Sequence, residues 1–158
     1  MTKNIQNHID SLTNKKNMQH LDLSNWCYAG KINLEGFTNL KTIDISNNKF
    51  TDLNFLFNLP NRMQLEGVNL FGNEIETLDF SRLLTTFSNL NYINLENNPL
   101  NGSILDNQAL LYLKELMDKK KLKVEINFRR GTLLLDSLKY INSLKKENEL
   151  FRENQKTL

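Results

Sequence analysis

Apolar residues recur at fixed positions in four segments of the first hundred residues. The segments share the pattern LxxLxL, and they are Met18–Leu23, Leu40–Ile45, Leu65–Leu70 and Leu90–Leu95. The end of each segment alternates apolar and polar residues with period two, which predicts a short strand that buries one face. We expect the four strands to pair in parallel, about 4.8 Å apart, in one sheet.

An asparagine follows three of these segments at the same distance. Asn48, Asn73 and Asn98 lie 25 residues apart, where the chain leaves each strand and turns. A side-chain amide there can donate and accept hydrogen bonds with backbone groups that have no partner in the sheet, and a buried unsatisfied group costs about 1–3 kcal/mol. The spacing predicts a buried asparagine ladder, with Trp26 in the matching place of the first unit as a cap over the end of the core.

The repeated strings resemble the leucine-rich repeat family. They are LDLSN (21–25), LKTIDISNNKF (40–50), LEGVNLFGNEI (65–75) and LNYINLENNPL (90–100), and the resemblance covers about residues 18–104. It implies an α/β fold, a right-handed solenoid with a curved parallel sheet, in which a protein partner binds the concave side of the sheet. Two units also carry an LxGxI-like element similar to plant-type repeats, so the array resembles a mixture of subclasses.

The pattern divides the chain into four parts. Ile5, Ile9 and Leu12 recur at helical spacing and predict a helical cap. A stretch rich in helix formers after the last repeat predicts a second cap helix at 106–121, followed by a strand at 123–128. The parts are an N-terminal helical cap at 1–17, four repeats at 18–104 with brief helical returns at 52–61 and 77–89, a C-terminal cap helix and fifth strand at 105–130, and an amphipathic helix at 131–158.

The amphipathic helix at 131–158 has two interpretations. Leu133, Leu134, Leu138 and Ile141 can dock it on the end of the solenoid. Alternatively, its heptad pattern forms a short dimeric coiled coil in which Asn148 occupies a core position and fixes a parallel pair. In the second case the chain is an assembly protein that dimerises through this helix.

The concave face is formed by the outward residues of the strands. Phe71 and Tyr92 are its aromatic residues, and aromatic side chains are frequent among binding hot spots; the alternative is that a neighbouring loop covers them. Asp22 and Asp44 form an acidic patch that can receive a lysine or arginine, or that is simply solvated. The residues expected to contact a partner are Phe71, Tyr92, His20, Asp22, Asp44, Asn69, Asn94 and Glu96.

Charge is distributed unevenly along the chain. Residues 1–106 carry 8 Lys and Arg against 11 Asp and Glu, a net charge of −3, whereas residues 107–158 carry 12 against 7, a net charge of +5. The basic segment 119–130 contains Lys119–Lys121, Lys123 and Arg129–Arg130. It therefore has an alternative role in binding nucleic acid, although a solvated cap is the simpler interpretation.

Catalytic chemistry finds little support in the sequence. His8 and His20 are the only histidines, and no glycine-rich phosphate loop is present. We therefore expect a non-catalytic protein with no metal site and no cofactor. Cys27 is the single cysteine, and we expect it to be a buried, inert thiol.

The compartment is also an expectation from sequence. The N-terminal residues are polar and no run of about 18 apolar residues occurs, so we expect a cytoplasmic protein.

Overall fold

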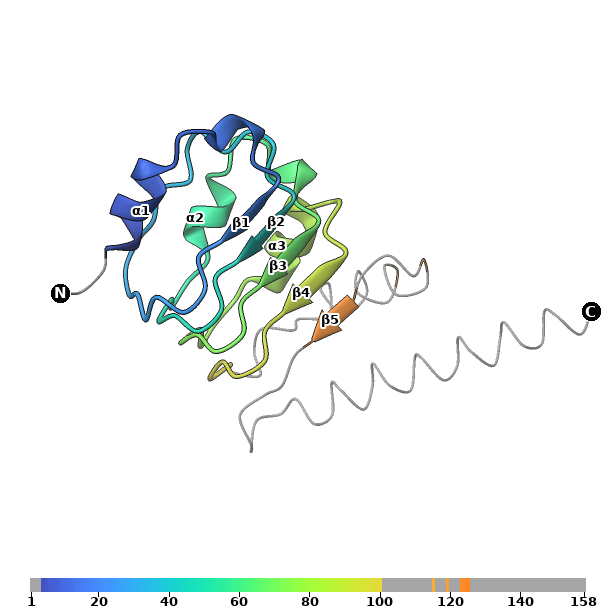
Figure 1. The fold of residues 1–158 in the computed structure, drawn as a ribbon. Coiled ribbons are helices and arrows are strands. Elements are labelled where there is room, and N and C mark those ends of the chain that lie inside the picture. The colour runs from blue at the N-terminus through green and yellow to red at the C-terminus, as the bar shows by residue number, and fades with distance from the viewer. Residues whose placement is uncertain (1–3, 101–114, 116–118, 120–122, 126–158) are drawn as a thin grey trace, which may run out of the picture.

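A parallel sheet organises the fold. The computed structural model describes residues 4–100, 115, 119 and 123–125. The fold is mixed α/β, as the sequence pattern predicts, and five short strands lie in chain order across the sheet (Figure 1). The strands are β1 (His20–Asp22), β2 (Thr42–Asp44), β3 (Gly67–Asn69), β4 (Tyr92–Asn94) and β5 (Lys123–Glu125).

The strands keep one register. His20 lies opposite Thr42, Thr42 opposite Gly67, and Gly67 opposite Tyr92. The offset is therefore 25 residues from β2 to β3 and again from β3 to β4. The middle residue of each of the first four strands is buried, because the period-two alternation turns it into the core: Leu21, Ile43, Val68 and Ile93.

Short helices return the chain from one strand to the next. In Figure 1, α2 and α3 lie on one face of the sheet, and no described helix lies on the opposite face. Both predicted returns contain a brief helix. The helical segments are α1 (Ile5–Ser11), η1 (Lys15–Asn17), α2 (Asn54–Phe57), η2 (Arg62–Gln64) and α3 (Phe80–Thr86).

Side-chain caps fix where the returning helices begin. The Asp79 carboxylate accepts a hydrogen bond of 2.8 Å from the backbone N–H of Arg82 in the first turn of α3. The Asp52 carboxylate accepts one of 2.9 Å from the N–H of Asn54 at the start of α2. Such caps satisfy donors that have no partner within the helix.

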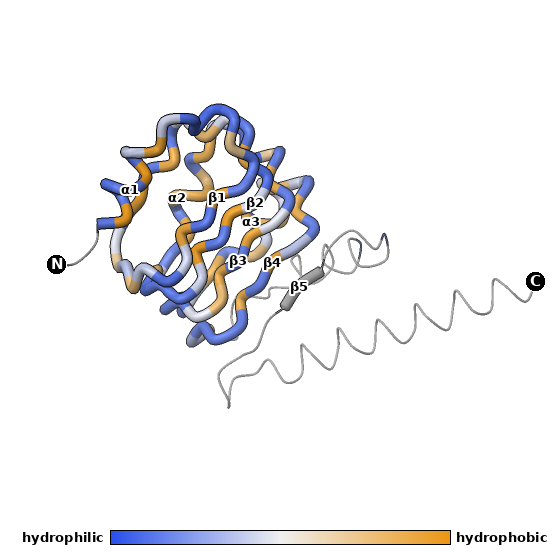
Figure 2. Tube along the Cα trace, in the orientation of Figure 1, coloured by the Kyte–Doolittle hydropathy of each residue, from blue (hydrophilic) through white to orange (hydrophobic). Residues whose placement is uncertain are grey.

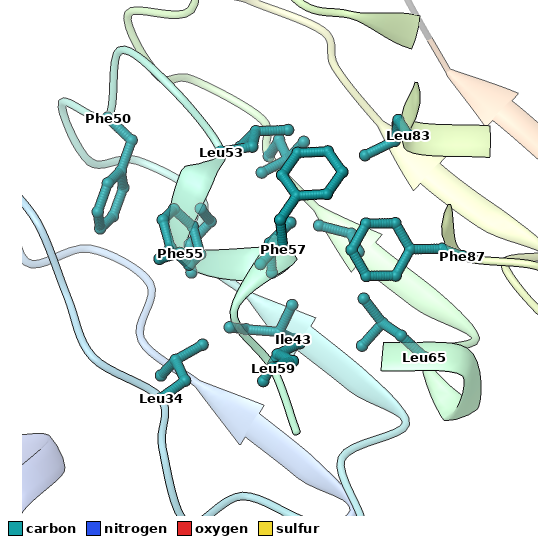
Figure 3. Close-up of a cluster of buried hydrophobic side chains, with 14 of the residues drawn as sticks. Leu34, Ile43, Phe50, Leu53, Phe55, Phe57, Leu59, Leu65, Leu83 and Phe87 are labelled. Atoms are coloured by element: carbon teal, nitrogen blue, oxygen red, sulfur yellow. The ribbon is translucent and has the colours of Figure 1, made fainter. Parts of the chain in front are cut away.

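Aromatic side chains fill the layer between the sheet and the helices (Figure 3). The ring centroids of Phe50 and Phe55 are 5.1 Å apart, and those of Phe57 and Phe87 are 5.4 Å apart. The guanidinium of Arg82 lies 4.1 Å from the centroid of Phe57. Figure 2 shows hydrophilic residues gathered at the turns on both ends of the strands, so the apolar residues form one continuous core.

Helix α1 covers the β1 end of the core. Ile5 and Ile9 are 0% and 1% exposed and belong to the core cluster, and Leu12 packs against it. The ring of His8 lies 4.9 Å from the ring of Trp26, which is half-buried against the same cluster. The apolar side of the first unit is therefore closed by the helix that the i, i+4, i+7 spacing predicts.

Several expectations fall outside the described residues. They concern the cap helix at 106–121, the helix at 131–158 with both of its interpretations, and most of the basic segment 119–130. Strand β5 coincides with the start of the strand expected at 123–128 and pairs in parallel with β4. Lys119 forms an ion pair with Glu115, and its hydrogen bond lowers the pKa of that carboxyl.

The described helices are all too short or too polar to cross a membrane.

Candidate functional site

The face of the sheet turned away from α2 and α3 is the candidate site, and we call it the open face. Its outward residues form three columns, each running across β1 to β4. The first two columns follow from the strand register, and the third lies two residues beyond the second. The columns are His20, Thr42, Gly67 and Tyr92; Asp22, Asp44, Asn69 and Asn94; and Ser24, Ser46, Phe71 and Glu96.

The middle column caps the turns that follow the strands. In each of its four residues, Oδ1 accepts a hydrogen bond from the backbone N–H two residues later, at distances of 2.8–3.2 Å. This local bond is an Asx turn, which both aspartate and asparagine can form. The column therefore has a folding role in addition to any contact with a partner.

Two members of this column also bond across strands. The Nδ2 of Asn69 donates a hydrogen bond of 2.8 Å to Oδ2 of Asp44. Both oxygens of Asp44 thus accept a bond within the fold, whereas Asp22 is exposed on the outer strand β1. Hydrogen bonds from the backbone N–H and the hydroxyl of Ser24 lower the pKa of Asp22, which therefore carries a negative charge at neutral pH.

The first column joins polar and aromatic ends. On its β1 side, Nδ1 of His20 and Oγ1 of Thr42 are hydrogen-bonded at 2.7 Å. On its β4 side, Tyr92 leans over Gly67: a Cβ added to the glycine would lie 3.7 Å from Cδ1 of the tyrosine ring. Gly67 is buried as a result, so the Tyr92 ring contributes to the surface of two strands.

The two aromatic residues of the open face are half-buried. Met63, with 63% exposure, is the one large hydrophobic residue that is largely exposed within the described part of the chain. The register places Phe71 and Tyr92 on neighbouring strands but four positions apart along them, which is about 13 Å. They therefore stand at opposite ends of the strands and do not form a single pair.

Asn94 requires a correction. The alternation of β4 predicts an outward, accessible side chain, but Asn94 is 9% exposed and is a buried residue. Its Oδ1 accepts the N–H of Glu96 at 2.9 Å, so the side chain is occupied in the turn. Asn94 is a structural residue of the middle column and is not an accessible contact.

The asparagine ladder lies on the other side of the turns, inside the molecule. Asn73 donates from Nδ2 to the carbonyl oxygens of Ile45 and Leu70, both at 3.0 Å, and accepts from the N–H of Phe50 at 3.0 Å. Asn48 and Asn98 make the equivalent bonds with the neighbouring turns. All three side chains are buried, and each links its own turn to the preceding one.

A further column was missed by the sequence pattern. The residue after each third-column position has a positive φ, and these residues are Asn25 (62°), Asn47 (54°), Gly72 (67°) and Asn97 (56°). Asparagine and glycine tolerate this conformation better than other residues. Nδ2 of Asn47 donates to Oδ1 of Asn25 at 3.0 Å, so the exposed turns are also joined by side chains. Paired Asn-Asn at 47–48 and 97–98 was the available signal.

Cys27 also differs from its expectation. It is exposed and has a φ of 51°, because the chain turns outward after Trp26 instead of burying the thiol. The prediction of a buried thiol is wrong.

Charge and metal-ligand chemistry are sparse around the open face. Lys41 and Glu66, which precede the first column on β2 and β3, form a partly exposed ion pair at 3.5 Å. Among the described residues, no group of three His, Cys, Asp or Glu side chains lies close enough to hold a metal ion.

Comparison with models of known protein families and with curated protein sequences found no match for this chain.

Proposed function

We propose that this chain is a short leucine-rich-repeat solenoid that binds a protein partner on the open face, which is the concave side of the sheet. The proposed role is that of a non-catalytic adaptor or scaffold. Support for the solenoid comes from the strand order, the 25-residue offsets and the buried asparagine at each turn. A solenoid of this kind presents one continuous surface built from successive units.

The observation that carries the proposed binding role is the position of Phe71 and Tyr92. Most outward residues of the open face are small or polar, and many bond within the fold. These two aromatic side chains keep part of their surface accessible at opposite ends of the strands. Aromatic residues are enriched among the few positions that dominate binding energy, because they bury a large rigid area on contact.

Alanine substitution tests this role. We expect the Phe71→Ala, Tyr92→Ala double variant to lose at least ten-fold in partner capture from cell extract, measured by quantitative mass spectrometry of affinity-purified material. Each single variant should lose less, because about 13 Å separates the two positions. Met63→Ala is the matched control, since it removes an exposed apolar side chain from η2, outside the open face.

Stability must be measured on the same variants. Tyr92 covers Gly67, so its removal should lower the unfolding free energy by about 1 kcal/mol. Capture that is unchanged in the double variant, or lost equally in the Met63 control, would rule out the open face as the binding site.

Two other roles stay as predictions from the sequence. Dimerisation through 131–158 and nucleic-acid binding through 119–130 both rest on residues that lie mainly outside the described part of the chain.

A further inference from the structure

We propose that the partner presents a basic, extended segment to the open face, in which a lysine or arginine meets Asp22 and Asp44 and a nearby apolar side chain meets Phe71 or Tyr92. The inference deepens the proposed function and rests on it. It adds the chemical class of the partner segment, and it divides the face into an anionic half on β1 and β2 and an aromatic half on β3 and β4.

The negative charges at 22 and 44 are not required for the turns. The middle column contains its own comparison, because Asn69 and Asn94 form the same Oδ1 bond to the N–H two residues later. Their distances, 3.2 and 2.9 Å, are close to the 2.9 and 2.8 Å of Asp22 and Asp44. An amide oxygen is therefore sufficient at this position, and the carboxylates supply charge in excess of what the fold uses.

The two charges are also close together and uncompensated within the described residues. Asp22 lies directly opposite Asp44 on neighbouring strands, which are about 4.8 Å apart. Like charges in this arrangement repel. The Asn69 amide donates to Asp44, but neither carboxylate forms an ion pair with a cationic side chain from the described residues, where Lys41 is paired with Glu66.

A cationic group from a partner satisfies both carboxylates at once. The unoccupied hydrogen-bonding capacity is greatest at Asp22, which is exposed and ionised. A guanidinium or ammonium between the two strands would be attracted by both charges, and charge complementarity of this kind selects partners and accelerates their association.

The register also sets the spacing of the partner segment. The middle of the β1–β2 pair and the middle of the β3–β4 pair are two strand spacings apart, about 10 Å. An extended chain advances about 3.3 Å per residue, so a segment that crosses the strands covers this distance in about three residues. The cation and the apolar side chain are therefore expected about three or four residues apart.

A peptide selection on the full chain tests the inference. The probe is a random dodecapeptide library displayed on phage and selected on the immobilised wild-type protein. We expect the selected sequences to be enriched at least two-fold in lysine and arginine over the library, with an aromatic or aliphatic residue three or four positions away. No selected peptide, or selected peptides without this enrichment, overturns the inference.

The decisive variant is Asp22→Asn, Asp44→Asn, which removes both charges and keeps the Oδ1 acceptors of the turns. The most enriched peptide, synthesised with a fluorescent label, should bind this variant at least ten-fold more weakly by fluorescence anisotropy. Its affinity for the wild type should fall as salt is raised. Asp52→Asn is the matched control, because Asp52 makes the same bond to the N–H two residues later but lies before α2; we expect less than a two-fold change.

Thermal unfolding separates a binding effect from a folding effect. The double asparagine variant should melt within a few degrees of the wild type, because the same turns are capped. Equal peptide affinity for the wild type and this variant would overturn the charge inference. If the Phe71→Ala, Tyr92→Ala variant loses the partner while the double asparagine variant retains it, the proposed function stands and only the basic character of the partner is excluded.

Discussion

Asn73 shows how one side chain joins two turns of the chain. It lies three residues beyond Leu70 and bonds to that carbonyl, to the carbonyl of Ile45 in the preceding turn, and to the N–H of Phe50. Each of these backbone groups lies beyond the end of a strand, where the sheet provides no partner. An amide is suited to this place because it donates and accepts at once.

Replacement of Asn73 should therefore be costly. We expect Asn73→Ala to lower the free energy of unfolding by about 2–3 kcal/mol, because buried backbone groups lose their partners and water cannot easily replace them. Asn69→Ala is the comparison, with an expected loss of about 1 kcal/mol, since its bonds lie on the half-exposed open face. Urea unfolding measures both values, and equal losses would contradict the assignment of Asn73 to the interior.

The residues also show which roles sequence spacing reveals. Asn48, Asn73 and Asn98 were identifiable because they recur at one interval after an apolar pattern. The turn-capping role of the middle column was not, since it depends on a local bond of Asp or Asn to the next turn, and asparagine is about one residue in six. The positive φ values after the third column were missed for the same reason: two asparagines and a glycine in a turn have many conformations open to them.

At the scale of elements, α1 closes the core at the β1 end. Its apolar residues lie on one side of a seven-residue helix, and Asn4 caps the helix by accepting the N–H of Gln6 at 2.9 Å. The Gln6 side chain accepts the N–H of Asn33 at 2.8 Å, so the helix is also tied to the first return. A helix this short is marginal alone, and its stability depends on packing against the core.

Loss of this packing should destabilise the whole molecule. We expect Ile9→Ala to reduce the unfolding free energy by about 2–4 kcal/mol, because it leaves a cavity under α1. Trp26, the single tryptophan, lies against His8 of α1 and reports on this region by its fluorescence. The fluorescence and circular dichroism transitions should coincide, and the exposed Asn7→Ala control should change neither. Separate transitions would mean that α1 is not part of the cooperative unit.

At the scale of the whole molecule, the sequence was most informative where it repeats. The LxxLxL units at 40, 65 and 90 placed β2, β3 and β4, because period-two burial and a constant interval leave one consistent register. Accessibility was less predictable: Asn94 and Cys27 depend on how neighbouring segments cover or expose a turn, which the alternation along a single strand does not encode.

The heptad pattern at 131–158 gives a prediction for the assembled state. If the three heptads pair, the full chain should have twice the mass of a monomer in solution, and a variant ending at residue 130 should be monomeric. Light scattering of both proteins at several concentrations measures this. A full chain that remains monomeric at high concentration would exclude the coiled coil and leave the docking interpretation of the helix.

The equal offsets between β2, β3 and β4 set the increment by which this chain can change length. Removal of 25 residues after Asn48 would join it to Glu74, and the shortened chain would still bring Thr42 opposite Tyr92 and Asn48 next to Asn98. Removal of 24 or 26 residues would turn apolar strand positions outward, since a shift of one residue exchanges the two faces of a strand. The molecule is therefore tolerant of whole units and intolerant of fractions of them.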